Sequence, residues 1–141
     1  MKHHFENHDL RTERCSQLID LTDEVAGAVA RAGVENGMAL VYSPHTTCAV
    51  LINELDPGID DDFSETLEAL APADRAYRHD QREGEHSVNG HSHVRAGLLA
   101  SSSQTIPVVG RKLLLGQHQR VFFCELDSAR ERKVLIQVIG E

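Results

Sequence analysis

Side chains that can bind a metal ion or carry a proton stand at the ends of apolar runs in this sequence. They fall into groups along the chain, which are His45 with Thr46 and Thr47, then Asn53 with Glu54 and Asp56, and finally His91 with His93. Binding and catalytic residues concentrate on loops that a rigid scaffold holds. The pattern therefore favours an enzyme or a ligand-binding site.

The His-x-His pair makes a metal site possible. On an extended backbone the rings of His91 and His93 would point to the same side, whereas a helix would separate them by about 200°. Two imidazoles, completed by His45 or His118 and a carboxylate, match the ligand set of a catalytic zinc or another divalent ion. Ordinary surface histidines would give the same spacing, and that alternative stays open.

The polar residues that follow the apolar run at 47–52 allow two interpretations. Asn53, Glu54 and Asp56 could hold a hard cation such as Mg²⁺, or Glu54 could receive a proton. Asp56 precedes Pro57 and Gly58, so it could equally form only a turn, and Glu54 could simply face solvent. Glu54 is therefore a candidate catalytic residue, and Asp56 is a candidate metal ligand.

Two further sets of residues offer nucleophilic or phosphate chemistry. Cys124 lies inside an apolar run, where it is either a small buried residue or a nucleophile that needs a neighbouring base. Glu125 would point to the opposite face of a regular strand. The guanidinium of Arg95 with the hydroxyls of Ser101 and Ser102 could bind phosphate, although serine clusters also commonly end helices.

The first elements that must position these residues are a strand and a helix. The pattern at residues 15–21 predicts a strand. Thr22 is then expected to cap a helix, which carries an apolar stripe and ends at Gly33. Residues 38–42 and 47–52 read as short strands that could form an antiparallel pair. Helical spacing returns at 59–70 and again at 94–101, and the polar stretch 72–90 between them reads as a long loop.

The C-terminal part of the sequence is rich in strands. Branched apolar runs are found at 105–109, 112–115, 120–126 and 133–139, and Gly110 with Arg111 predicts a hairpin turn. Strands therefore outnumber helices without regular βαβ alternation. We expect a single domain over residues 1–141, of the α+β class, with a largely antiparallel sheet.

Composition narrows the possible partners. The formal net charge of -8 over 141 residues opposes nucleic-acid binding, and no apolar run approaches the roughly 20 residues of a membrane span. Since residues 1–10 are also too polar for a signal peptide, we expect a soluble cytoplasmic protein with its three cysteines reduced. The histidines at 3, 4 and 8 could lie on an edge strand, on a mobile tail or in a cloning remnant.

Three segments together resemble the secondary thiamine-phosphate synthase family, also called YjbQ-like. They are PHTTCAVLINELDP, NGHSHVRAGLLASSSQTIPVVGRKLLLG and VFFCELDSARERKVLIQVIGE, in that order. The resemblance implies a compact α+β fold, a homotrimer with pockets near the subunit interfaces, and an activity that joins an aminopyrimidine methyl pyrophosphate to a thiazole phosphate. The protein would act on a small phosphorylated substrate and would bind a divalent metal ion, zinc or magnesium.

Carried over residue by residue, the resemblance places the family's motifs on His45, Thr46, Thr47, Asn53, Glu54, Asp56, Asn89, His91 and His93. Many relatives have Asp where this chain has His91 and Trp where it has His118, and the approach to Asn89 is also unlike theirs. The candidate catalytic residues are thus His45, Glu54, His93 and Cys124. The candidate substrate-binding residues are Thr46, Thr47, Asn53, Asn89, Arg95, Ser101 and Ser102. The candidate metal ligands are His45, His91, His93, His118 and Asp56.

Two alternatives to the transferase remain. A histidine-bound ion could activate water for hydrolysis. The same pocket could also serve a trimeric protein that binds a metal or small ligand without catalysis.

Overall fold

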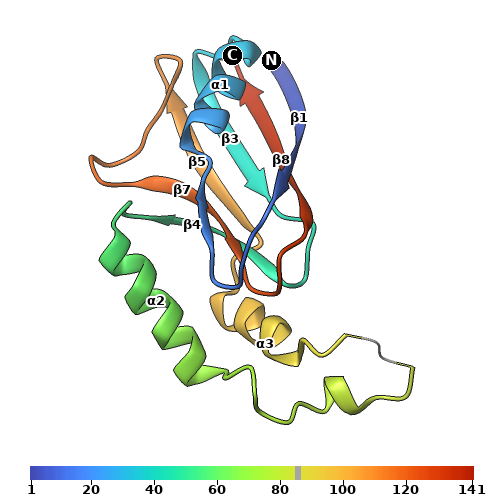
Figure 1. Ribbon diagram of the computed structural model, residues 1–141. Helices are drawn as coiled ribbons and strands as arrows, with labels where there is room; N and C mark the ends of the chain where they lie inside the picture. Colours follow the sequence, from blue (N-terminus) through green and yellow to red (C-terminus); the bar gives the residue numbers. More distant parts are fainter. Residues whose placement is uncertain (85–86) are drawn as a thin grey trace.

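The computed structural model describes residues 1–84 and 87–141, which fold into two antiparallel sheets and three α-helices (Figure 1). The elements in chain order are β1 (Lys2–Arg11), β2 (Leu18–Asp20), α1 (Thr22–Ala32), β3 (Asn36–Tyr42), β4 (Cys48–Asn53), α2 (Pro57–Leu70), the 3₁₀ turn η1 (His79–Gln81), α3 (Gly90–Leu99), β5 (Ser103–Val109), β6 (Lys112–Leu113), β7 (Arg120–Glu125) and β8 (Glu131–Gly140). One sheet has the order β1-β8-β3-β5-β6 and the other the order β2-β7-β4. The predicted α+β class is confirmed.

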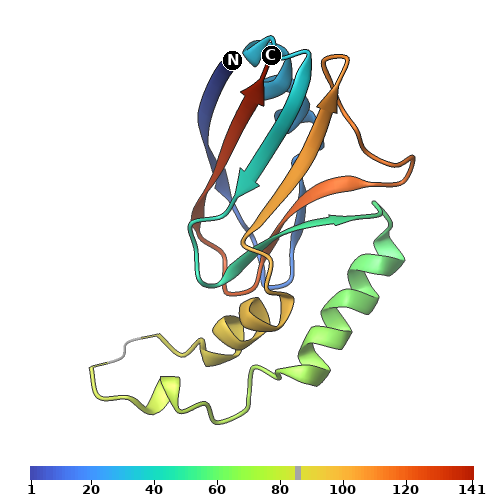
Figure 2. The same ribbon diagram turned by 180° about the vertical axis from the view of Figure 1, so that it is seen from behind.

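The main core lies between the larger sheet, the smaller sheet and α1. Inward-facing branched residues of β3, β5 and β8 pack with the apolar stripe of α1 and with Val121 and Phe123 of β7. A second, smaller core holds α2 and α3 against the smaller sheet through Leu67, Cys124 and Leu126. Figures 1 and 2 show α2 and α3 at one end of the sheets, away from α1 and the chain termini.

The first helix was predicted at the right place but with the wrong cap. Thr22 is the first helical residue, and Leu21 occupies the cap position without a side-chain bond. Asp20 takes that role instead, because its Oδ1 accepts hydrogen bonds from the backbone N–H and the hydroxyl of Thr22 (2.9 and 2.6 Å). Gly33 ends the helix in the left-handed region as predicted, with φ of 60°.

The predicted pairing of the strands at 38–42 and 47–52 is wrong. β3 pairs with β5 and β8 in the larger sheet, whereas β4 pairs with β7 in the smaller one. The chain between them therefore crosses from one sheet to the other at residues 43–47. The strand predicted at 15–21 is shorter than expected, since only Leu18–Asp20 pairs with β7. The hairpin turn at Gly110 and Arg111 is confirmed, with both residues at positive φ.

The helices next to the candidate site begin differently from their predictions. α2 begins at Pro57, and Asp56 caps it by accepting a hydrogen bond from the Ile59 N–H (3.1 Å). α3 begins at Gly90, earlier than the predicted 94, so that it includes both His91 and His93. The stretch between α2 and α3 is a long loop as predicted, interrupted only by η1 among its described residues.

The histidine-rich N-terminal segment is an edge strand. β1 pairs along its whole length with β8, and its inward face carries a charged cluster beside Leu10, which packs against the main core. Glu6 contacts His4 and His8 (2.6 and 2.7 Å) and accepts two hydrogen bonds from Arg31 of α1. Inward-pointing charges of this kind discourage further strand pairing at a sheet edge.

Within the described ranges, no helix is long and apolar enough to cross a membrane.

Candidate functional site

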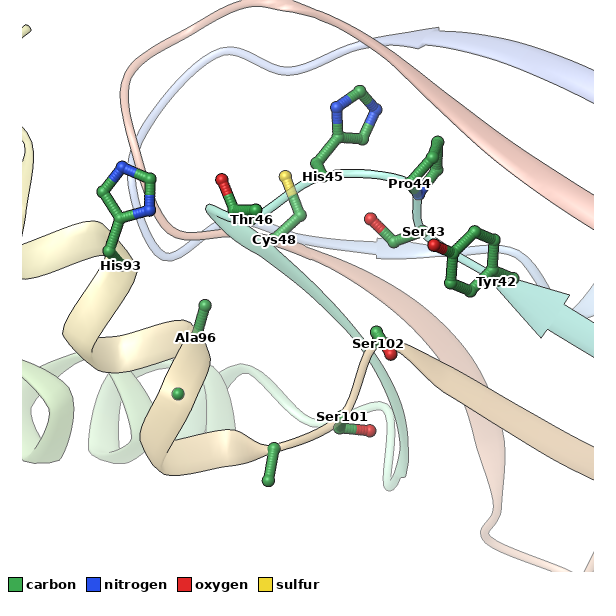
Figure 3. A pocket seen from close by; sticks show the side chains of 12 residues that line it. Tyr42, Ser43, Pro44, His45, Thr46, Cys48, His93, Ala96, Ser101 and Ser102 are labelled. Carbon is green, nitrogen blue, oxygen red and sulfur yellow. The ribbon is translucent and has the colours of Figure 1, made fainter.

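A cavity of about 570 Å³ lies between the loop after β3 and the exposed side of α3. His45 faces it from the loop and His93 faces it from the first turns of α3, as Figure 3 shows. Tyr42, Thr46 and Ser102 complete its polar wall. We call this space the histidine cavity.

A second hollow, of about 300 Å³, adjoins the histidine cavity and shares Pro44, His45, Thr46 and His93 with it. Its remaining lining residues are Thr47, Asn89, Arg130 and Arg132. We call it the arginine cavity. Because the two hollows have walls in common, they form one site that combines imidazole, hydroxyl and guanidinium groups.

The fold brings three distant segments to this site. The crossing between the sheets supplies residues 43–47, and two backbone hydrogen bonds hold it, from Ser43 N to the carbonyl oxygen of Ser102 and from Leu126 N to that of Thr47. The start of α3 supplies Asn89 and His93. The connection between β7 and β8, together with the start of β8, supplies the arginines.

Arg132 is held by a buried ion pair with Glu125. Its Nε and Nη2 donate to the carboxylate at 2.7 and 2.6 Å, and Nη2 also donates to the Thr47 hydroxyl (3.0 Å). Glu125 is fully buried and accepts further hydrogen bonds from the Thr12 hydroxyl and the Asp127 N–H. The carboxylate is thus saturated with donors, which is the condition for a buried charge to be tolerated.

Arg130 belongs to a second, more exposed pair. Its Nη2 contacts the Asp127 carboxylate at 2.7 Å, and the same carboxylate accepts a hydrogen bond from Asn89 Nδ2 (2.7 Å). Asn89 is only 6% exposed, yet its Oδ1 has no hydrogen-bond partner. The structure thus leaves an unsatisfied acceptor beside a partly exposed guanidinium.

His45 is held by the backbone of Lys133. Its Nε2 lies 2.9 Å from the N–H and 3.2 Å from the carbonyl oxygen of Lys133, so Nδ1 is the nitrogen without a protein partner among the described residues. Burial, reinforced by the charge of Arg132, lowers the pKa of His45 below its usual value. The ring is therefore neutral near pH 7, and Nδ1 is the nitrogen that it can offer to a ligand.

His93 is positioned by the loop that precedes α3. Its ring lies against that of His79, with centroids 4.7 Å apart and the ring planes tilted by 40°. The Asp80 carboxylate contacts His79 Nδ1 (3.0 Å) and accepts hydrogen bonds from the N–H groups of Asn89 and Gly90 at the start of α3. Asp80 thus fixes both the helix start and the ring on which His93 rests.

The extended His-x-His pair is not formed. His91 and His93 lie on α3, so their side chains diverge by about 200°. His91 faces away from the histidine cavity, toward Tyr77 (ring centroids 6.4 Å apart) and a different hollow. Among the residues that the structure describes, no group of three or more His, Cys, Asp or Glu side chains could hold a metal ion.

The other half of the predicted site lies at the opposite end of β4. Glu54 and His118 contact each other there, with 3.5 Å between Oε1 and Nδ1, and both are exposed. Asn53 accepts from the Glu54 N–H, and Asp56 caps α2. β4 has six residues, or roughly 20 Å at a strand's rise. Within this chain these residues therefore do not join His45 and His93.

The predicted phosphate clamp is not formed either. Arg95 is buried, and its guanidinium donates to the Ala71 carbonyl oxygen, to Glu68 and to Cys15 Sγ. Ser101 donates to the Val50 carbonyl oxygen, and both Ser101 and Ser102 line the histidine cavity. The guanidinium and the hydroxyls thus face different parts of the molecule.

The thiol of Cys124 lies in the environment opposite to that of a nucleophile. It is fully buried among the apolar residues of the second core, and burial raises its pKa. Cys48 lines the histidine cavity, but burial and the charge of Glu125 raise its pKa to about 12. Neither thiol is therefore ionised near pH 7.

Sequence reasoning missed the two arginines of the site. Both lie in the polar stretch 127–132 between two predicted strands, where the local sequence pattern indicates only a break between them. One signal was present: Glu125 stands inside an apolar strand, and a buried carboxylate requires a cationic partner. Arg132, on the following strand, is that partner.

Comparisons with known proteins give consistent matches. A family model described as UPF0047 protein YjbQ-like matches residues 6–141. A UPF0047 protein of Methanothermobacter thermautotrophicus is 39% identical over 132 residues, covering 94% of this chain and 89% of that protein. UPF0047 protein YugU of Bacillus subtilis is 33% identical over 133 residues, covering 93% and 96%.

Solved structures resemble the whole chain as well. A YbjQ-like protein of unknown function from Sulfolobus solfataricus has a TM-score of 0.91 at 30% identity and covers 99% of each chain. An uncharacterized conserved protein of the yjbq/upf0047 family from Clostridium acetobutylicum has a TM-score of 0.86 at 38% identity, with 95% of this chain and 99% of that chain covered. The fold described above is thus shared along nearly its full length.

Proposed function

This chain belongs to the UPF0047 protein YjbQ-like family, and from that premise we propose that it is a small-molecule transferase resembling thiamine-phosphate synthase. The reaction joins an aminopyrimidine methyl pyrophosphate to a thiazole phosphate and releases pyrophosphate. One observation carries the proposal: two guanidinium groups, two threonine hydroxyls and two imidazoles line one continuous site. Such a set of donors suits a phosphorylated anion.

The charge that develops on the leaving pyrophosphate determines the roles of these groups. Arg132 has its Nε and Nη2 committed to Glu125 and Thr47, and within the described chain its Nη1 has no protein partner. That group and Arg130 would bind the phosphate oxygens, and His45 would contact them from the same wall through Nδ1. Preorganised donors of this kind stabilise developing negative charge.

His93 is the preferred group for proton transfer. The Lys133 N–H occupies Nε2 of His45, whereas His93 lines both parts of the site from α3. In the proposed reaction the bond between the methylene carbon and the pyrophosphate oxygen breaks, the thiazole nitrogen bonds to that carbon, and His93 protonates the departing oxygen.

A resident metal does not fit the site as the structure has it. Mg²⁺ prefers carboxylate and water oxygens, and the carboxylates near the arginine cavity are already paired with Arg130 and Arg132. A zinc site would need a third ligand beside His45 and His93. His91 faces a different hollow, and His118 contacts Glu54 at the other end of β4. A magnesium ion that enters with pyrophosphate would belong to the substrate, and no step is assigned to a protein-bound ion.

Assembly into a homotrimer is part of the proposal. The outer face of the larger sheet exposes three large apolar side chains, with Phe5 at 50%, Met38 at 47% and Tyr42 at 39% exposure. Monomeric proteins rarely expose large apolar patches, so we commit to a second copy of this chain as the occupant of this face. Tyr42 also lines the histidine cavity, which would place the site beside the interface.

The test is direct. Purified protein mixed with both substrates and magnesium should form thiamine phosphate, detected by chromatography, and His93→Ala should abolish the product without lowering the melting temperature. His118→Ala, an exposed histidine at the opposite end of β4, is the matched control and should retain activity. Equal turnover by wild type and His93→Ala would reject the role of His93. Pyrophosphate binding without product from the substrate pair would favour the non-catalytic ligand-binding alternative.

A further inference from the structure

A separate hollow of about 400 Å³ lies on the side of α3 that His91 faces. It is lined by Cys15, Asn89, His91, Asp127, Ser128 and Arg130, and we call it the Cys15 cavity. Asn89 and Arg130 are shared with the arginine cavity, while Cys15 and His91 have no part in the function proposed above. The inference below does not depend on that function.

Cys15 differs from the other two cysteines of the chain. Its side chain is partly exposed, whereas Cys48 and Cys124 are buried. Nη1 of Arg95 donates a hydrogen bond to its Sγ at 3.3 Å. Arg95 is itself only 2% exposed and is also paired with Glu68, and the thiol lies 3.3 Å from the Leu126 carbonyl oxygen. These contacts hold the sulfur in one place on the wall of the hollow.

His91 supplies a base in the same cavity. Burial and the charge of Arg95 lower its pKa, so the imidazole is neutral near pH 7. A neutral imidazole can accept the proton that a thiol loses when it reacts. The thiol and the base therefore line one hollow, and Arg95 is hydrogen-bonded to the sulfur.

Two further groups point to a ligand. Oδ1 of Asn89 is a buried acceptor without a partner, and such atoms require an explanation because an unmade hydrogen bond is costly. A ligand N–H in the cavity would satisfy it. Arg130, whose side chain is 41% exposed, can receive a carboxylate at the rim. The complementary ligand thus carries amide or ammonium hydrogens and a carboxylate.

We propose that the Cys15 cavity is a thiol-modification site, at which Cys15 exchanges with a low-molecular-weight disulfide that carries N–H and carboxylate groups. His91 takes the proton from Sγ, and the sulfur attacks one sulfur of the disulfide. The S–S bond of the ligand breaks, a mixed disulfide forms on Cys15, and the other half leaves as a thiolate that takes the proton from His91. One disulfide replaces another, so no further oxidant is needed.

Oxidised glutathione is a suitable probe, followed by intact mass and peptide mapping of the folded protein. Wild type should gain one glutathionyl group, on Cys15, at least about tenfold faster at pH 7 than an unstructured peptide with a single cysteine. Cys15→Ser should gain none, and Cys48→Ser should react as wild type does. An adduct on Cys48, no adduct, or a rate equal to that of the peptide would overturn the proposal.

Two variants that keep the thiol test the surroundings. His91→Gln should slow the reaction by about tenfold at pH 7, because it removes the base. Arg130→Gln should slow the reaction with oxidised glutathione and leave the rate with uncharged hydroxyethyl disulfide unchanged. If neither variant changes either rate, the cavity does not direct the chemistry and the site is rejected.

Discussion

The guanidinium of Arg132 lies 2.6 Å from the carboxylate of Glu125, and both side chains are almost entirely buried. The two residues belong to successive strands of different sheets, so their pairing ties the larger sheet to the smaller one behind the candidate site. It also directs one arginine of the site against Thr47. The same pair thus serves both the fold and the proposed binding of an anion.

Removing one partner of this pair should be costly. Glu125→Gln leaves the Arg132 charge buried without its counterion, and we expect a loss of about 3–5 kcal/mol in the free energy of unfolding. Urea denaturation measures it. The matched control is Glu131→Gln, which removes the carboxylate of the exposed pair with Arg11 and should cost under about 1 kcal/mol. Equal losses in the two variants would contradict the buried-pair interpretation.

His45 should make stability depend on pH in a defined direction. Its pKa is lowered by folding, so between the usual value of 6.5 and the folded value the unfolded chain binds more protons. The free energy of unfolding should therefore fall as the pH drops through this window. His45→Gln should show a smaller fall between pH 7 and about pH 5, measured by urea denaturation.

Above pH 7 the curves of wild type and His45→Gln should run parallel, because the ring is neutral in both the folded and the unfolded chain. Some dependence on pH should remain in the variant, since the pKa of His91 is lowered in the same direction. Curves that also run parallel below pH 7 would show that His45 does not contribute.

The outer face of the larger sheet should control assembly. Wild type is expected to have three chain masses by light scattering, and Met38→Glu should yield the single chain because it places a charge in the apolar interface. Leu114→Glu is the control, since Leu114 is also exposed but lies in the loop after β6. A monomeric wild type would remove the trimer from the proposal.

Two glycines of α3 should respond oppositely to the same change. A Cβ on Gly90 would lie 2.5 Å from the Cβ of Tyr77, so Gly90→Ala must displace the start of the helix, at a cost of about 1–3 kcal/mol. Gly97 has open space, and Gly97→Ala should stabilise the helix by about 0.5–1 kcal/mol. Thermal denaturation compares them.

The displacement at Gly90 should also weaken pyrophosphate binding, because His93 is on the displaced turn of α3. Calorimetry with inorganic pyrophosphate measures this effect. If Gly90→Ala binds pyrophosphate as wild type does, then His93 is not part of the binding surface.

Local sequence was sufficient for the elements whose signals lie within them. The apolar stripe before Gly33 predicted α1, the spacing before Leu70 predicted α2, and Gly110 with Arg111 predicted the turn between β5 and β6. These features depend on neighbours a few residues away. The α+β class followed from the same signals, because it needs only the types and the order of the elements.

The start of α3 could not be found in this way. The residues around His91 and His93 include glycine, serine and histidine, which are not strong helix formers. The helix begins early because Asp80, ten residues before Gly90 in the chain, accepts hydrogen bonds from the backbone N–H groups there. A contact through a folded loop therefore decided that the two imidazoles diverge.

The sequence by itself determined the helices and strands with local signals, the fold class and the family resemblance. The tertiary structure decided which strands pair, that His45 and His93 share a hollow while His91 turns away, and that Arg130 and Arg132 line it. The physical reason is the range of the interactions. Helix periodicity and turns are set by neighbouring residues, whereas burying the Arg132 charge requires Glu125 from another sheet.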